Sequence, residues 1–249
     1  IYPARAIMST PLRADSVILV TGGGRGIGRA ICVAAGDAGA TVIPAARTAS
    51  QVEAAADEIR GRGGKAAAYT VDLEREESIV GLFERIRSEF GRLDVLVNNA
   101  GIGLFGPVAE FAAADLDRVM AVNLRGTFLC CREAMKLMTP RRAGYIINIS
   151  SVVGIKGYAN QAAYTASKHG VMGLTKSLAA EAQPHEIRVS AVLPGGVDTE
   201  MVQASRPDLD RSVLLQPEDI AQTVLFLLSL PDRAAIDEIY IRRRASRPF

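Results

Sequence analysis

The sequence Thr21-Gly-Gly-Gly-Arg-Gly-Ile-Gly28 stands between an apolar run, residues 16–20, and a helical pattern over residues 26–38. At such a junction the free N–H groups and the dipole of a helix N-terminus favour a bound phosphate. A Cβ at Gly22 would obstruct the turn, and one at Gly28 would push the helix off the strand. A glycine-rich turn that binds nothing is the alternative, but the strand–turn–helix setting favours a nucleotide-binding turn.

Six further apolar runs alternate with helical patterns along the rest of the chain. Runs rich in Val, Ile and Leu suit strands that are covered on both faces. The alternation predicts the α/β class, with one doubly wound, mostly parallel seven-stranded sheet, helices on both faces and right-handed crossovers, which is a Rossmann fold. Pro44 is awkward in a central strand because it has no N–H to donate. The further strands are expected at residues 41–46, 66–71, 93–97, 145–149, 188–193 and 236–241, and the helices at 26–38, 50–62, 75–90, 115–138, 160–183 and 217–230.

The length and composition favour a single domain. The chain has 249 residues, of which 49% are apolar, so it can bury a sizeable core and is not disordered as a whole. It contains no internal repeat, low-complexity linker or charge block that would mark a boundary. We therefore expect one dinucleotide-binding and catalytic domain over residues 14–242, between an N-terminal tail, residues 1–13, and a basic C-terminal tail, residues 243–249.

The charge and the cysteine content exclude several classes of function. A net charge of +2, from 29 Lys+Arg against 27 Asp+Glu, provides no field that would attract nucleic acid. No apolar run reaches the roughly 18–20 residues of a membrane span, so no membrane partner is expected. Cys32, Cys130 and Cys131 lack metal-ligand spacing, and the chain has only two histidines, so we expect no metal site. Three thiols without a secretory signal favour a reducing cytoplasm.

The residues after the second apolar run bear on the choice of cofactor. Dinucleotide sites often place an acid there, to accept hydrogen bonds from the adenosine ribose. This chain instead has Arg47, and Arg25 lies in the glycine turn. A guanidinium holds a phosphate in a bidentate manner, so the pattern favours NADP(H) over NAD(H). The alternative is that both arginines are solvated surface cations.

Asp72 ends the third apolar run and has two equally favoured interpretations. Its carboxylate would accept a hydrogen bond from the adenine amino group, or it would cap the helix that follows. One side chain can serve both purposes.

Tyr164 and Lys168 lie four residues apart in a helical stretch, which puts them on one face. A phenol with a pKa of about 10 is a poor acid or base near neutrality. An ammonium group close by would stabilise the phenolate, lower that pKa and allow proton transfer near neutral pH. An ordinary amphipathic pair is the alternative.

Ser150 and Ser151 follow the fifth apolar run, at the edge where open α/β sheets bind ligands. A serine hydroxyl there would hydrogen-bond a carbonyl oxygen beside Tyr164. The alternative is that both serines cap or form a turn before Gly154. Neither histidine nor carboxylate is obviously paired with Ser151, which disfavours a hydrolase triad.

The ordered set of these motifs resembles the short-chain dehydrogenase/reductase family, in its single-domain branch, over residues 14–242. The fit is carried by the order and the separations of the motifs together. They are Thr21-Gly-x3-Gly-Ile-Gly28, Asp72-Leu73, Asn98-Asn-Ala-Gly101, Asn123, Ser151, Tyr164-x3-Lys168 and Pro194-Gly-x3-Thr199.

The resemblance implies a role for each motif. Tyr164 would be the general acid in reduction, Ser151 would hold the carbonyl oxygen, Lys168 would contact the nicotinamide ribose, Asn123 would hold a water, and Thr199 would hold the carboxamide. Without the rest of the set, Asn123 would be taken for a buried helix asparagine and residues 98–101 for a tight turn. The cofactor-binding set would be Gly22, Gly24, Arg25, Gly26, Ile27, Gly28, Arg47, Asp72, Leu73, Asn99, Ala100, Gly101, Tyr164, Lys168, Pro194, Gly195, Val197 and Thr199.

The activity implied is reversible hydride transfer between NADP(H) and a carbonyl or secondary alcohol, in a homodimer or homotetramer. A non-catalytic redox sensor of the same fold is the rival function. The chain is similar to 3-oxoacyl-carrier-protein reductases, whose docking arginines flank the cleft. Arg141 or Arg142 matches one such position, but His185 stands where the second is expected, which weakens an acyl-carrier partner. A simple ketone, a sugar or a steroid-like alcohol stays open.

Two segments beyond the motifs concern the substrate and the subunit contacts. The short lid over residues 200–216 suggests an open cleft. Met201 and Val202 are candidate wall residues or, equally, a helix face packed on the core, and Leu104, Phe105 and Val153 are further candidates for the wall. The chain ends in a basic tail instead of the family's usual Asp-Gly-Gly, so the C-terminal contact across a tetramer is in doubt. A short charged tail is expected to be solvated, or to reach a neighbouring subunit.

Overall fold

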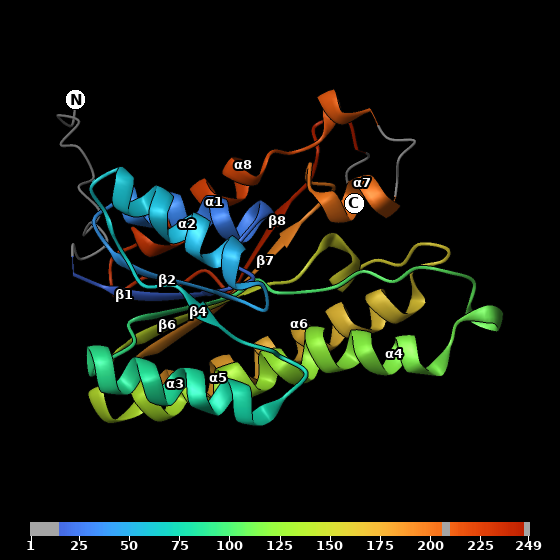
Figure 1. Ribbon diagram of the computed structural model, residues 1–249. Helices are drawn as coiled ribbons and strands as arrows, with labels where there is room; N and C mark the ends of the chain where they lie inside the picture. Colours follow the sequence, from blue (N-terminus) through green and yellow to red (C-terminus); the bar gives the residue numbers. More distant parts are fainter. Residues whose placement is uncertain (1–14, 206–209, 247–249) are drawn as a thin grey trace, which may run out of the picture.

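A computed structural model describes residues 15–205 and 210–246, so the expected N-terminal tail lies outside the described residues. A single sheet forms the middle layer, with α1, α2 and α8 on one face and α3, α5 and α6 on the other (Figure 1). Every strand pairing in it is parallel. The fold is therefore the doubly wound α/β architecture that the alternating pattern predicted.

The sheet has the order β3-β2-β1-β5-β6-β7-β8, with β4 also paired to β2. The chain winds outward from β1 in one direction and then returns to β1's other side, which opens a crevice beyond the carboxyl ends of β1 and β5. The strands are β1 (Val17–Thr21), β2 (Thr41–Ala46), β3 (Lys65–Ala66), β4 (Tyr69–Thr70), β5 (Val95–Asn98), β6 (Gly144–Ile149), β7 (Ile187–Pro194) and β8 (Glu238–Ile241).

Alternating side chains of each strand supply two cores. In β1, Ile18 and Val20 pack with residues of α1 and α8, such as Ile31 and Ile220, whereas Leu19 packs on the opposite face with Ile146 and others. All six of these side chains are buried. The helices are α1 (Gly26–Asp37), α2 (Ala49–Gly61), α3 (Glu76–Phe90), α4 (Ala113–Met120), α5 (Thr127–Met138), α6 (Ala162–Ala182), α7 (Glu200–Ser205) and α8 (Pro217–Leu228).

Pro44 does lie in β2, and the sheet is interrupted beside it. Val42 accepts a hydrogen bond from the N–H of Ala67 on the β3–β4 side, so Pro44, two residues on, faces that side too. Since proline has no N–H to donate, the expected third strand is divided into β3 and β4 next to it. The missing donor faces the edge of the sheet, and the pairing of β2 with β1 continues through Pro44.

Two helical features differ from the prediction. The expected helix at 115–138 is interrupted by a π-helical segment, η2 (Ala121–Gly126), between α4 and α5. Asn123 lies in this segment and is 1% exposed. The second feature is α7, a short helix within the expected lid that was not among the helices expected from the pattern.

The described ranges bear on two of the expected absences, a membrane span and a metal site. None of the helices there is both long and apolar enough to cross a membrane. The same residues contain no cluster of His, Cys, Asp or Glu side chains that could hold a metal ion.

Candidate active site

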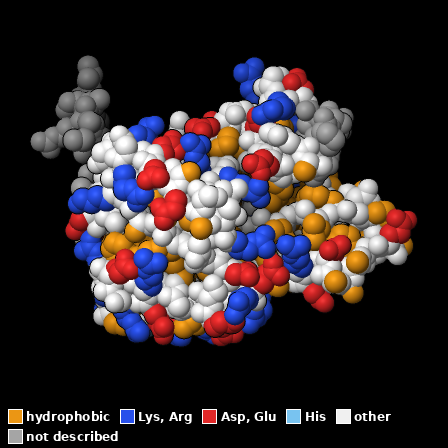
Figure 2. Space-filling view, viewed as in Figure 1, with side chains coloured by type: hydrophobic (Ala, Val, Ile, Leu, Met, Phe, Trp, Pro, Cys, Tyr) orange, Lys and Arg blue, Asp and Glu red, His pale blue; other side chains and the backbone are white. Residues whose placement is uncertain are grey.

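A cavity of about 430 Å³ lies at the carboxyl ends of the strands. The space-filling view shows the molecule hollowed between the part that carries α7 and the part that carries α4, with hydrophobic side chains on the inner wall (Figure 2). Of the site residues predicted from the sequence, all line this cavity except Gly28 and Asn123, which support it from beneath.

The glycine turn is packed too closely for side chains. Gly22 has a φ of +67°, and a Cβ there would lie 2.9 Å from the Cα of Ala100. A Cβ at Gly28 would lie 2.2 Å from the carbonyl oxygen of Gly22, closer than atoms approach. Asn99 secures the turn from β5, because its Nδ2 donates to the carbonyl oxygens of Thr21, at 3.1 Å, and of Gly22, at 3.3 Å. The cradle at the start of α1 therefore fits a dinucleotide, whose pyrophosphate needs close backbone approach.

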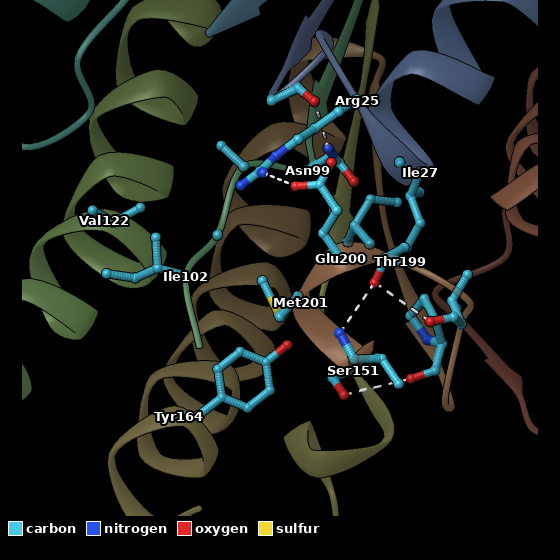
Figure 3. Close-up of a pocket in the computed structure, with 18 of the residues that line it drawn as sticks. Arg25, Ile27, Asn99, Ile102, Val122, Ser151, Tyr164, Thr199, Glu200 and Met201 are labelled. Carbon is cyan, nitrogen blue, oxygen red and sulfur yellow. Dashed lines mark hydrogen bonds and ion pairs between the residues drawn. The ribbon is translucent and has the colours of Figure 1, made fainter. Parts of the chain in front are cut away.

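The two arginines proposed for the cofactor phosphate pair with different carboxylates. Arg47, after β2, lines the cavity and forms an ion pair with Glu74 at 3.3 Å. Arg25 also lines the cavity and forms an ion pair with Glu200, the first residue of α7 (Figure 3). Each guanidinium therefore already has a carboxylate partner, and the role of both arginines at the cofactor phosphate stays a prediction.

Asp72 lies in the turn before α3 and faces the cavity, but it does not cap the helix as one interpretation expected, and its contact with adenine stays a prediction. Its Oδ1 accepts a hydrogen bond from the N–H of Glu74 at 3.1 Å, in the turn that precedes α3, and the residue lines the cavity. The residue that caps α3 is Arg75, so Asp72 stabilises the approach to the helix and is not the cap itself. The neighbouring Leu73 is buried and packs against the π-helical segment, where a Cβ at Gly126 would lie 2.9 Å from it.

Tyr164 projects from α6 into the cavity, and Ser151 lies beside it (Figure 3). The ring of Phe105 packs edge-on against that of Tyr164, with the centroids 5.6 Å apart. Ser151 accepts a hydrogen bond from the N–H of Val153 at 3.3 Å, and its hydroxyl donates to the carbonyl oxygen of Pro194 at 3.4 Å. It therefore caps the short turn η4 (Val152–Gly154) while its side chain faces the cavity. Ser150 is buried and donates to the carbonyl oxygen of Lys168.

The ionisation of the pair differs from the expected lowering of the tyrosine pKa. Burial raises the pKa of Tyr164 to about 12, and the side chain of Ser151 opposes this only in part. Burial also lowers the pKa of Lys168 to about 8. The Lys168 Nζ donates to the carbonyl oxygen of Ile149 at 2.9 Å and lies 5.8 Å from the centroid of the Tyr164 ring. Burial is therefore the main influence on both groups, and with a pKa of about 12 Tyr164 is protonated at neutral pH.

Asn123 connects the loop after β5 with α6. Its Oδ1 accepts from the N–H of Ile102 at 2.8 Å, while its Nδ2 donates to the carbonyl oxygen of Ile102 and to the hydroxyl of Ser167. A Cβ at Gly101 would lie 3.3 Å from this Oδ1 and 3.6 Å from the Nζ of Lys168. The amide of Asn123 thus fixes the backbone beside Lys168, and the water expected there stays a prediction.

The loop after β7 brings Thr199 and its neighbours to the cavity. The hydroxyl of Thr199 accepts from the N–H of Val202 at 3.5 Å, which ties it to the start of α7. Pro194, Gly195 and Val197 line the same wall.

Several cavity residues lie outside the predicted set. Phe105, Val153, Met201 and Val202 line the cavity as expected of wall residues, whereas Leu104 is not among the lining residues. Other lining residues could not be predicted from the sequence because they belong to none of the motifs. They include Ile102, Val122, Tyr158, Gln161, Glu200 and Arg243.

The arginines considered for carrier docking lie at the wrong edge of the sheet. Arg141 pairs with Asp94, which precedes β5, and Arg142 pairs with Glu186, which precedes β7. These are amino-terminal ends of parallel strands, whereas the cavity lies at the carboxyl ends. His185 is next to Glu186 and shares that location. Within one chain, therefore, this group does not flank the cavity.

Known proteins resemble this chain in both sequence and structure. A 3beta-hydroxysteroid dehydrogenase of Mediterraneibacter gnavus is 40% identical over 196 residues, which cover 78% of this chain and 71% of the relative. A 3-oxoacyl-acyl-carrier-protein reductase of Aquifex aeolicus is 40% identical over 222 residues, covering 86% and 90%. A metagenomic short-chain oxidoreductase, solved in complex with NADP, superimposes with a TM-score of 0.82 at 38% identity, covering 93% of this chain and 98% of that one.

The family model for short chain dehydrogenases matches residues 16–210, which is most of the chain. This range contains the glycine turn, the Tyr164–Lys168 pair and the loop that leads to α7. The chain therefore belongs to the short-chain dehydrogenase family and is an oxidoreductase.

Proposed function

We propose that this enzyme transfers hydride reversibly between NADP(H) and a carbonyl or secondary alcohol, with Tyr164 as the general acid in reduction. The observation that carries the proposal is that the hydroxyls of Tyr164 and Ser151 and the amine of Lys168 face one cavity with the glycine turn. The two relatives are named for a steroid and for an oxoacyl carrier, so likeness alone does not select a substrate for this chain.

The residues divide the chemistry between them. The bound nicotinamide would supply the hydride, which reduces the carbonyl carbon and becomes a C–H bond of the alcohol. Ser151 and Tyr164 donate hydrogen bonds to the carbonyl oxygen, where negative charge develops. Tyr164 then gives its proton to that oxygen, and the product is the neutral alcohol. Because Tyr164 stays protonated at neutral pH, the proton needed for reduction is in place.

Lys168 assists this proton transfer through its charge. Its pKa of about 8 means that it is mostly charged at neutral pH. The charge favours the phenolate that remains after Tyr164 has given its proton away, and so lowers the barrier to that step. It also leaves hydrogen-bond donors beyond the one used on Ile149, which suit the ribose hydroxyls of the cofactor.

The preference for NADP(H) is part of the proposal. The end of β2 carries no carboxylate to accept from a ribose 2′-hydroxyl, and Arg47 lines the cavity at that point. A guanidinium suits the 2′-phosphate that distinguishes NADP(H). The dimer or tetramer that the resemblance implied and the cytoplasmic location that the three thiols favoured both stay predictions.

The test is a panel of ketones, aldehydes, sugars, steroids and an acyl thioester, with both cofactors and in both directions. Tyr164→Phe should lower kcat by about 100-fold or more while NADPH still binds, because the proton donor is lost and the cradle is not. Tyr158→Phe removes a hydroxyl from the same cavity and should retain activity. Substantial turnover by Tyr164→Phe would refute the catalytic role, and NADPH binding without turnover of any compound would favour the redox sensor.

A further inference from the structure

A second cavity, of about 290 Å³, adjoins the first. We call it the side cavity. Its lining includes three cations, Lys156, Arg242 and Arg243, and no carboxylate. Val152, Tyr158, Gly195, Gly196 and Arg243 line both cavities, so the two spaces share a wall.

The cations of the side cavity have no acidic partner in the part of the chain that the structure describes. Within the described residues, no carboxylate forms an ion pair with Lys156, Arg242 or Arg243, whereas Arg25 and Arg47 in the main cavity both have one. The Lys156 Nζ lies 5.4 Å from the centroid of the Tyr240 ring. Three half-buried cations around a small cavity repel one another, and an anion bound there would relieve the repulsion.

Arg242, Arg243 and Ser246, near the C-terminus, line this cavity. Arg242 Nη1 donates to the backbone carbonyl oxygens of Arg243, Arg244 and Ser246, which closes a turn after β8. Arg243 Nε donates to the hydroxyl of Ser246 at 3.2 Å. The expectation of a solvated tail is therefore wrong for Arg243 and Ser246, while Arg244 and Ala245 are exposed as expected and residues 247–249 lie outside the described part.

Arg243 is also directed to the catalytic end of the main cavity. The N–H of Gly195 donates to the carbonyl oxygen of Ile241 at 2.7 Å, which fixes the turn against the loop after β7. A Cβ at Gly196 would lie 3.6 Å from the Cδ and Nε of Arg243, so the arginine stem runs along this loop. The same loop begins at Pro194, whose carbonyl oxygen accepts from Ser151. A molecule with its carbonyl at Ser151 therefore has a cationic wall within the same space.

We propose that the side cavity is an anion subsite and that the substrate is a carbonyl or alcohol compound bearing a carboxylate or a phosphate, which Arg243 binds with the support of Lys156. The planar fork of Arg243 makes two parallel hydrogen bonds to either group, and the ammonium of Lys156 adds charge. Arg242 is occupied with the turn and positions Arg243. This inference rests on the proposed function, because it assumes that the reacting carbonyl lies at Tyr164 and Ser151.

The experiment compares acids with their own neutral esters. Linear methyl-ketone carboxylic acids of increasing chain length are assayed with NADPH beside their methyl esters, and ketone phosphates beside the corresponding free alcohols. The wild-type enzyme should prefer the best acid or phosphate by about tenfold or more in kcat/KM, mainly through KM. The carboxylate and phosphate arms show which anion fits.

Variants assign the preference to the side cavity. Arg243→Gln should reduce the acid-to-ester ratio to about one, Arg243→Glu should invert it, and Lys156→Gln should reduce it in part. Arg244→Gln is the matched control, since Arg244 is the exposed neighbour that lines neither cavity, and its ratio should equal that of the wild type. Thermal denaturation of each variant checks that the fold is intact.

The two proposals fail in different ways. Equal turnover of acids and esters by the wild-type enzyme would overturn the anion subsite and leave the oxidoreductase mechanism standing. If no carbonyl compound is turned over, the proposed function fails, and the subsite is tested by equilibrium titration of the NADPH complex with the same carboxylates and phosphates. Binding that Arg243→Gln abolishes supports the subsite, and binding that it leaves unchanged, or no binding at all, overturns it.

Discussion

Lys168 shows how the demands of chemistry and of stability compete at a single residue. Its side chain is 4% exposed, and burial lowers its pKa from 10.5 to about 8. Each unit of pKa corresponds to about 1.4 kcal/mol, so a charged Lys168 destabilises the fold by about 3 kcal/mol at neutral pH. The ammonium charge of Lys168 is therefore retained although it destabilises the fold, which is typical of a functional group.

Lys168→Met should stabilise the protein at neutral pH while abolishing its activity. The expected gain is about 1–3 kcal/mol, since the desolvation cost disappears but the hydrogen bond to Ile149 is lost. The folded-state pKa lies below the unfolded value, so the cost is fully present below about pH 8 and fades as the pH rises toward 10.5. Urea denaturation at neutral and at high pH measures both parts.

The control for this prediction is Lys176→Met on the same helix. The Lys176 side chain is 66% exposed and pairs with Glu238, so its loss should change the free energy of unfolding by less than about 0.5 kcal/mol. A Lys168→Met variant that is less stable than the wild type at both pH values would contradict the account.

Arg47→Asp should shift the coenzyme preference toward NADH. A carboxylate at the end of β2 would repel the 2′-phosphate and accept from a ribose hydroxyl, so the NADPH-to-NADH ratio of kcat/KM should fall by about tenfold or more. Arg118→Asp provides the comparison, because Arg118 pairs with the same Glu74, at 3.5 Å, but does not line the cavity. An unchanged ratio in Arg47→Asp would remove this residue from the specificity.

At the scale of elements, the strands were predictable because buried parallel strands read as Val/Ile/Leu runs, and all seven expected runs pair in the sheet. The division of the third strand was not predicted, because it depends on which side of β2 Pro44 faces. The π-helical segment was also missed, and α7 was considered only as an alternative for Met201 and Val202. Asn123 and Gly126 within one helical stretch were the available signal for the π-helical segment. In α7, Thr199 accepts the hydrogen bonds that start the helix, whereas the resemblance had implied only a cofactor role for it.

In the candidate site, too, some residues could be predicted from the sequence and others could not. Motif residues such as Tyr164, Ser151 and Asp72 meet at one cavity because parallel strands carry their carboxyl ends to one edge. Arg243 and Glu200 were not predicted to line the cavity, since each belongs to a segment without a motif and reaches the cavity through tertiary packing. Electrostatics was hardest to predict, because the pKa of Tyr164 depends on burial that no spacing reveals.

The junction between β1 and α1 should not tolerate a methyl group. Gly28→Ala would place a Cβ 2.2 Å from the backbone oxygen of Gly22, so we expect a loss of about 1–3 kcal/mol in the free energy of unfolding together with weaker NADPH binding. Gly81→Ala in α3 is the matched substitution, since a Cβ there meets nothing within 4 Å. It should stabilise the protein by about 0.5–1 kcal/mol. Denaturant titrations of both variants decide the matter, and equal effects would refute the packing argument.

On the scale of the whole molecule, the two cores on either face of the sheet leave no thiol near the surface. Cys32 lies in the core beneath α1, while Cys130 and Cys131 lie in the opposite one. All three are free and buried, and burial raises the pKa of each thiol, that of Cys131 to about 12. The cysteines therefore act as small apolar residues in packing.

Native protein should consequently resist thiol reagents. At mildly alkaline pH the three thiols should react with Ellman's reagent only as fast as the protein unfolds, and all three should react at once in denaturant. Added NADPH should slow the reaction further, because a ligand that binds only the folded state reduces the unfolded fraction. Rapid modification of one thiol in the native protein would contradict this prediction, because it would show that the thiol becomes accessible through local opening.

The interruption beside Pro44 has a consequence for the behaviour of the protein at high concentration. An uninterrupted outer strand offers a row of unsatisfied amides on which another chain can polymerise into fibrils. Here that border consists of two separate pieces of two residues each, Lys65–Ala66 and Tyr69–Thr70, so no foreign strand finds a continuous template. The same proline that breaks the ladder thus guards the molecule against aggregation along this border.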